Sequence, residues 1–146
     1  MRSLNSAPPL ALICILAVCT VAYSSTVTGT YAGTVQLTML IPALGTEMTD
    51  SGTAEITVSD MGAGKYQVHI KTKVPSMPES DETREYTLSG DTLSLNEVEE
   101  LQDLRVVHSG SLTVSGTTMT GTISTVGTVG GQVQTSQTAS FNLTRQ

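Results

Sequence analysis

Apolar and polar residues alternate with a period of two through most of this chain. The alternation is clearest over residues 27–41, where the even positions are mostly Thr or Gln and the odd ones hold the apolar side chains Val27, Tyr31, Val35, Leu37, Met39 and Ile41. Because successive side chains of a strand point to opposite faces, this segment is predicted to be a strand with one buried face. A straight strand of this length exceeds the needs of a small domain, so we expect a bend near the inward-facing Gly33.

The same alternation predicts a hairpin in the next part of the chain. Residues 54–58 place apolar side chains at every second position, and residues 66–74 do so at Tyr66, Val68, Ile70 and Val74. A glycine-containing turn, residues 60–64, lies between them. This arrangement is typical of two antiparallel strands joined by a short turn. Residues 75–82 are polar, contain two prolines and lack periodicity, so we expect a loop there.

The rest of the chain predicts shorter strands. They are expected over residues 85–89, 92–95, 103–108, 112–114, 119–124 and 139–143. Ser109 and Gly110 are expected to form a turn, the glycine-rich residues 126–132 a mobile connection, and residues 96–102 the only candidate helix. About eight short strands at close spacing predict an all-β domain, an antiparallel up-and-down meander closed into a barrel, with a β-sandwich as the alternative.

Residues 1–24 have the features of a signal peptide. Arg2 supplies a positive charge, residues 10–22 form an apolar run interrupted only by Thr20, and Ala22, Tyr23 and Ser24 include the small residues that a signal peptidase prefers. The run is shorter than the about 20 residues that a membrane-spanning helix needs, so no transmembrane segment is expected. We therefore predict a secreted or extracytoplasmic single domain over residues 25–146.

Both cysteines, Cys14 and Cys19, lie in this first segment. The sequence Leu16-Ala17-Val18-Cys19 resembles the box at which bacteria acylate a cysteine, although Val18 stands where Gly, Ala or Ser is usual. The alternative to free secretion is therefore lipidation of Cys19, which would anchor the domain at the cell envelope. In either case the domain contains no cysteine, and its stability must come from packing and backbone hydrogen bonds.

Four segments carry a family resemblance. Residues 29–34 (Gly-Thr-Tyr-Ala-Gly-Thr), 64–68, 86–90 and 121–123 resemble, in rhythm and turn placement, the calycin-like domains of exported bacterial lipoproteins. The resemblance implies a small lipocalin-like antiparallel barrel and brings no assigned catalytic residues with it. True lipocalins carry a G-x-W motif on the first strand, whereas this chain has no tryptophan and places Tyr31 at that position.

Charge and composition exclude several functions. The formal net charge is −6, and no basic patch interleaved with aromatic residues occurs, so nucleic acid is not expected as a partner. The two histidines are far apart: His69 falls on a polar strand face and is expected in solvent, whereas His108 falls on an apolar face and is expected near the barrel mouth. Without an orienting partner or ligand spacing, neither predicts a catalytic, cofactor or metal site.

The acidic residues after the middle of the chain form a second candidate for a metal. They lack the regular spacing and the turn glycine of a calcium loop, and we interpret them as a solvated connection: Glu97, Glu99, Glu100 and Asp103. No activated nucleophile or strand-to-helix serine elbow is present, so the chain is predicted not to be an enzyme.

Two functions remain. The first is transport of a small apolar ligand in the barrel, because small inward residues such as Gly33, Gly121 and Ala139 would leave space; the predicted lining is Tyr31, Val35, Met39, Ile56, Val68, Met119 and Phe141. The second is a structural or protein-interaction module with a filled core and functional loops at residues 75–82 and 126–132.

Asn142 begins an Asn-Leu-Thr sequon and is expected on the outer face, where a eukaryotic host could glycosylate it. The oligomeric state is left open by the sequence.

Overall fold

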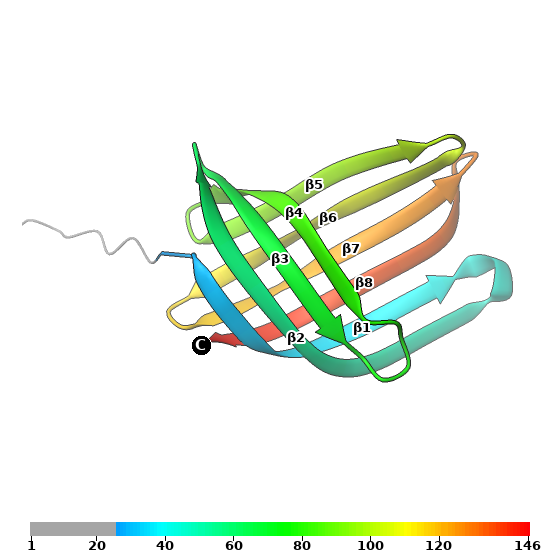
Figure 1. The fold of residues 1–146 in the computed structure, drawn as a ribbon. Coiled ribbons are helices and arrows are strands. Elements are labelled where there is room, and N and C mark those ends of the chain that lie inside the picture. Colours follow the sequence, from blue (N-terminus) through cyan, green and yellow to red (C-terminus); the bar gives the residue numbers. More distant parts are fainter. Residues whose placement is uncertain (1–25) are drawn as a thin grey trace, which may run out of the picture.

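Residues 26–146, which are the part of the chain described by this computed structural model, form a closed antiparallel barrel of eight strands (Figure 1). Each strand pairs with the next, and the last pairs with the first, so the predicted meander and its closure are confirmed and the sandwich is excluded. The strands are β1 (Gly29–Ile41), β2 (Thr46–Gly62), β3 (Lys65–Lys73), β4 (Ser80–Ser89), β5 (Thr92–Leu101), β6 (Leu104–Ser115), β7 (Thr118–Val129) and β8 (Gln132–Arg145).

The period-two pattern of the first strand is confirmed. Tyr31, Val35 and Leu37 of β1 are buried in the barrel, whereas Gln36 between them is exposed. A short 3-10 turn, Pro42–Leu44, joins β1 to β2, and it is the sole helical element within residues 26–146. No helix in this range is long and apolar enough to cross a membrane.

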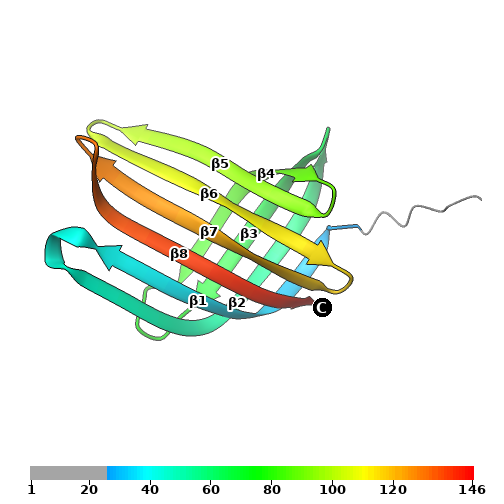
Figure 2. The ribbon, with the colours of Figure 1, turned by 180° about the vertical axis from the view of Figure 1, so that it is seen from behind.

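Several glycines allow neighbouring strands to approach closely. A Cβ atom on Gly33 of β1 would lie 2.4 Å from the carbonyl oxygen of Asn142 in β8, and one on Gly121 of β7 would lie 2.0 Å from that of Ser111 in β6. Only glycine fits at these two points. Figure 2 shows the strands concerned, β1, β8, β7 and β6, side by side in one wall of the barrel. Gly33, which was predicted to mark a bend in β1, is therefore required by the close approach of the β8 backbone.

Three sequence-based assignments of local structure were wrong. Residues 96–102 are not helical, because β5 continues to Leu101 in register with β6. Ser109 and Gly110 are not a turn, because β6 passes through them while pairing with Ser124 and Ile123 of β7. Residues 126–132 are not a mobile connection but the ends of β7 and β8, joined by a two-residue turn of Gly130 and Gly131, both with positive φ.

One end of the barrel is closed, and it is the end at which the described chain begins and finishes (Figure 1). Tyr31 lies there without solvent exposure, and its hydroxyl donates to the carbonyl oxygen of Val27 at 3.0 Å. The guanidinium of Arg145 covers the Tyr31 ring at 5.2 Å from the centroid, and its Nη2 donates to the Tyr31 hydroxyl at 2.6 Å. This stack seals the closed end of the barrel.

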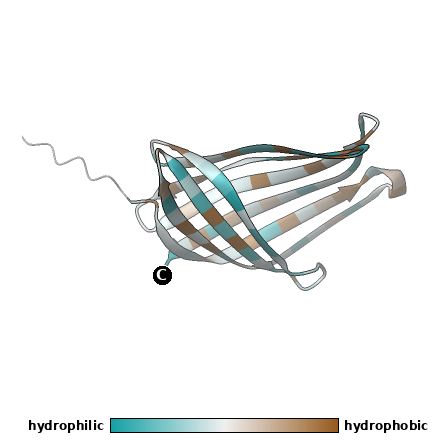
Figure 3. Ribbon diagram, turned by 45° about the horizontal axis from the view of Figure 1, so that its top comes forward, coloured by the Kyte–Doolittle hydropathy of each residue, from teal (hydrophilic) through white to brown (hydrophobic). Residues whose placement is uncertain are grey.

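The other end is open, because two neighbouring strands separate there. β4 and β5 pair only through residues 87–89 and 92–94, next to their shared turn, and diverge beyond it (Figure 3). The β3–β4 loop lies at this open end; residues 75–79 form the predicted loop, whereas Ser80 already begins β4. Asp50 of β2 fixes the loop by accepting hydrogen bonds from the Ser76 hydroxyl at 2.5 Å and the Ser76 amide at 3.2 Å.

Candidate functional site

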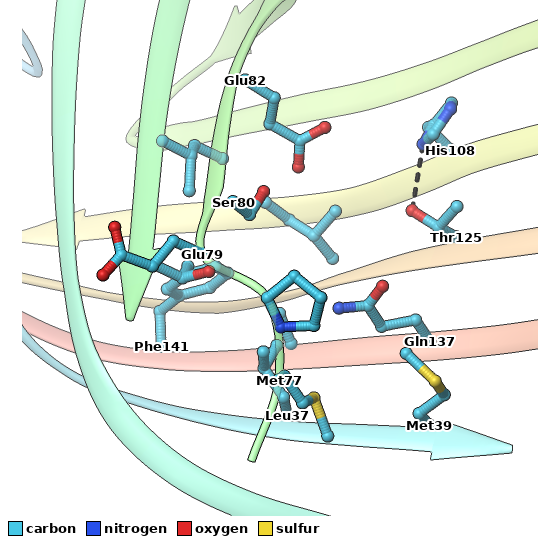
Figure 4. Close-up of a pocket in the computed structure, with 15 residues that line it drawn as sticks. Leu37, Met39, Met77, Glu79, Ser80, Glu82, His108, Thr125, Gln137 and Phe141 are labelled. Atoms are coloured by element: carbon cyan, nitrogen blue, oxygen red, sulfur yellow. Dashed lines mark hydrogen bonds between the residues drawn. The ribbon is translucent and has the colours of Figure 1, made fainter. Parts of the chain in front are cut away.

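The open half of the barrel contains a cavity of about 330 Å³. Its apolar surface comes from four different strands, which contribute Leu37, Ile70, Ile123 and Phe141, and from Met77 of the β3–β4 loop (Figure 4). A cavity of this volume is within the range that holds one small molecule, and an eight-stranded barrel is just wide enough to enclose it.

Polar side chains reach into the same cavity from its other walls. Glu82 of β4, His108 of β6, Thr125 of β7 and Gln137 of β8 all line it (Figure 4). The Nδ1 atom of His108 and the hydroxyl of Thr125 form a hydrogen bond of 3.0 Å, which orients a ring that is 6% exposed. The prediction that His108 points inward near the mouth is confirmed, and the cavity combines an apolar floor with a polar side.

An arginine connects the two separated strands beside this cavity. Arg84 of β4 donates from Nη1 to Glu97 at 2.7 Å and to Glu99 at 2.9 Å, both on β5, and from Nε to Glu82 at 3.2 Å. Its side chain is 16% exposed. These charge-assisted bonds replace the backbone ladder that β4 and β5 lack at this point.

The acidic segment is not the connection that was expected, because β5 runs through Glu97, Glu99 and Glu100. Its solvation is confirmed at Glu100, which is 74% exposed, and at Asp103, which is exposed in the β5–β6 turn. Glu97 and Glu99 lie on the inner face, in step with the buried Leu93 and Leu95, because β5 keeps its alternation to its end. The hydrogen bond from Arg84 holds the pKa of Glu99 below its usual value, so this carboxylate stays ionised.

Tyr86 follows Arg84 on the inner face of β4 but belongs to the packed core, and it is not among the residues that line the cavity. It is 1% exposed, and its hydroxyl has no hydrogen-bond partner among the described residues. Burial raises the pKa of Tyr86, and the negative charge of Glu82 raises it further, so the phenol stays protonated.

The seven residues predicted to line a ligand cavity divide between the two halves of the barrel. Met39 and Phe141 line the cavity. The other five fill the closed half, each 1% exposed or less: Tyr31, Val35, Ile56, Val68 and Met119. The structure thus brings two of the seven to the cavity and packs the rest beneath it.

Apolar alternation does not reveal the charged part of the site. On β4 the even positions face inward, and these include Glu82 and Arg84 as well as Tyr86. The charged residues at inward positions of β4 could have indicated this part of the site, because charged groups are buried only when they are paired.

The remaining candidate residues lie outside the cavity. His69, expected in solvent, lies on the outer face, where Nε2 pairs with Asp81 at 2.5 Å. Asn142 is exposed on β8, as the sequon requires, and its glycosylation stays a prediction. No group of metal-ligating side chains occurs within residues 26–146. The signal peptide and Cys19 lie outside the described residues and also stay predictions.

Comparison with known proteins identifies the fold but not a family. No protein-family model and no curated protein matches the chain. A solved structure described as "EF1p2_mFAP2b bound to DFHBI" is similar with a TM-score of 0.53 and 16% sequence identity, over 82% of this chain and 94% of the other. At that identity the likeness concerns the fold, which is a lipocalin-like, or calycin-like, eight-stranded barrel.

Proposed function

We propose that this protein is an exported, non-enzymatic binding protein that holds one small, largely apolar ligand in the open half of its barrel. The observation that carries the proposal is the cavity of about 330 Å³ with its floor of Leu37, Ile70, Ile123 and Phe141. The similar barrel is described as bound to DFHBI, which supports a small-molecule occupant. His108 is hydrogen-bonded to Thr125 and His69 lies on the outer face, which favours binding over catalysis.

Binding of an apolar dye tests the proposal. N-phenyl-1-naphthylamine should bind the folded protein with a Kd in the micromolar range, about −8 kcal/mol, and its fluorescence should rise. Ala139→Trp places a large ring in the cavity that Ala139 lines, and it should weaken dye binding at least about tenfold.

Ser140→Trp is the matched control. Ser140 is the next residue of β8, so its side chain points to the opposite face of the strand. This variant should bind the dye as the wild type does. Equal affinity of both variants, or no saturable binding by the wild type, would refute a ligand site in the cavity.

One observation favours the second candidate, a protein-interaction module. Leu44 and Leu101 are 72% and 62% exposed, and they lie in hairpins at the open end. Exposed apolar side chains gathered at one end are typical of contact surfaces. If the wild type binds no dye while its fold is intact, this interaction function remains as the better account.

A further inference from the structure

The charges around Arg84 do not balance. Three carboxylates, those of Glu82, Glu97 and Glu99, contact one guanidinium. His108 lies 3.6 Å from Glu99, and even with its imidazole protonated the negative charges outnumber the positive ones. A concave, partly dehydrated site with this excess attracts a cation, because low-dielectric walls strengthen the field inside it.

The excess charge faces the cavity at one residue. Glu82 uses Oε2 for its bond to Arg84, whereas its Oε1 accepts no hydrogen bond from residues 26–146. Glu82 is also the acidic residue of this cluster that lines the cavity, and its carboxylate projects into the space shown in Figure 4. A donor group on a ligand would therefore find a free carboxylate oxygen above the apolar floor.

We propose that the cavity selects molecules that carry a primary ammonium group on an apolar body, with Glu82 binding the ammonium. This inference rests on the proposed function and adds the chemical class of the ligand. The ammonium group has N–H donors and a positive charge, which match the free Glu82 oxygen and the excess negative charge around Arg84. The hydrocarbon part lies on Leu37, Ile123 and Phe141.

Four matched ligands separate charge, hydrogen bonding and hydrophobic binding. Octylamine, octan-1-ol, octanoate and octyltrimethylammonium share one chain and compete at pH 7 with N-phenyl-1-naphthylamine; at this pH the amine is protonated. Octylamine should displace the dye at a concentration about tenfold lower than octan-1-ol, because its hydrogen bonds are charge-assisted. Octyltrimethylammonium has no N–H donor and should bind more weakly than octylamine, and octanoate should bind worst.

Substitutions then test the assigned residue. Glu82→Gln should reduce the preference for octylamine over octan-1-ol to about threefold or less. The control Glu85→Gln removes an equal charge from the outer face of the same strand, where Glu85 pairs with Lys65 at 2.7 Å, and should keep the full preference.

The outcomes distinguish this inference from the proposed function. If octan-1-ol or octanoate binds as tightly as octylamine, the ammonium site is refuted, whereas dye binding still supports the cavity. If the dye itself does not bind, both proposals fail. The comparison of the four ligands on the wild type decides the matter even if Glu82→Gln fails to fold.

Discussion

The close approach of β6 and β7 gives a sharp prediction for Gly121→Ala. The new Cβ would lie 2.0 Å from the carbonyl oxygen of Ser111 and 2.9 Å from Cα of Leu112. Both atoms belong to the backbone of β6, which pairs with β7 along its length, so relief requires the strands to move apart. Overpacking that forces the backbone to shift destabilises a protein more than overpacking that side chains can relieve. We therefore expect Gly121→Ala to lower the free energy of unfolding by about 3 kcal/mol.

Gly127→Ala is the control on the same strand. Its Cβ would meet the Thr135 hydroxyl at 3.0 Å and a Leu104 methyl at 3.7 Å, and both are ends of side chains that can rotate. The change should therefore stay within about 1 kcal/mol, with part of any cost offset by the lower entropy of the unfolded chain. Urea unfolding measures both variants. Equal losses would contradict the close strand spacing at Gly121.

Two further predictions concern the open end. Arg84→Met leaves Glu97 and Glu99 without their cation, so it should lower the free energy of unfolding by about 1–2 kcal/mol. It should also speed hydrogen exchange in the second half of β5. Unchanged exchange would show that Arg84 does not hold β5. The hydrogen bond from the Ser76 hydroxyl lowers the pKa of Asp50 from 3.8. The stabilisation of the loop by ionised Asp50 is therefore present above pH 3.8 and is lost as the pH falls through the lowered pKa. Exchange of the Ser76 amide should rise in that acid range in the wild type, and Asp50→Asn should show no such acid-dependent rise.

The strands that could be predicted are those in which inward positions are apolar. β1 and the β2–β3 hairpin have this pattern, and both exist where the alternation placed them, although β2 begins at Thr46 rather than at residue 54 and extends to Gly62, inside the predicted turn. The end of β5 could not be assigned in this way, because Glu97 and Glu99 occupy its inward positions. These two carboxylates can face inward because Arg84 of β4 pairs with both of them. The residue pattern of β5 alone does not show which residue of another strand pairs with it.

The position of the cavity was missed for a related reason. Of the small inward residues that were expected to leave space, Ala139 does line the cavity, but the room beside Gly33 and Gly121 is occupied by the backbones of β8 and β6. These glycines bring strands together rather than open a cavity. The space arises instead where β4 and β5 separate, and strand separation depends on pairing that alternation along one strand does not encode.

Methyl NMR tests the central claim most directly, because buried methyl groups are present in both halves of the barrel. On addition of N-phenyl-1-naphthylamine, the account predicts shifts for Leu37, Ile70 and Ile123, which line the cavity. It predicts no comparable shifts for Ile56, Leu112 and Leu143, which are fully buried in the packed core and do not line the cavity. Shifts concentrated in this second group, or confined to the outer surface, would contradict a ligand site in the open half of the barrel.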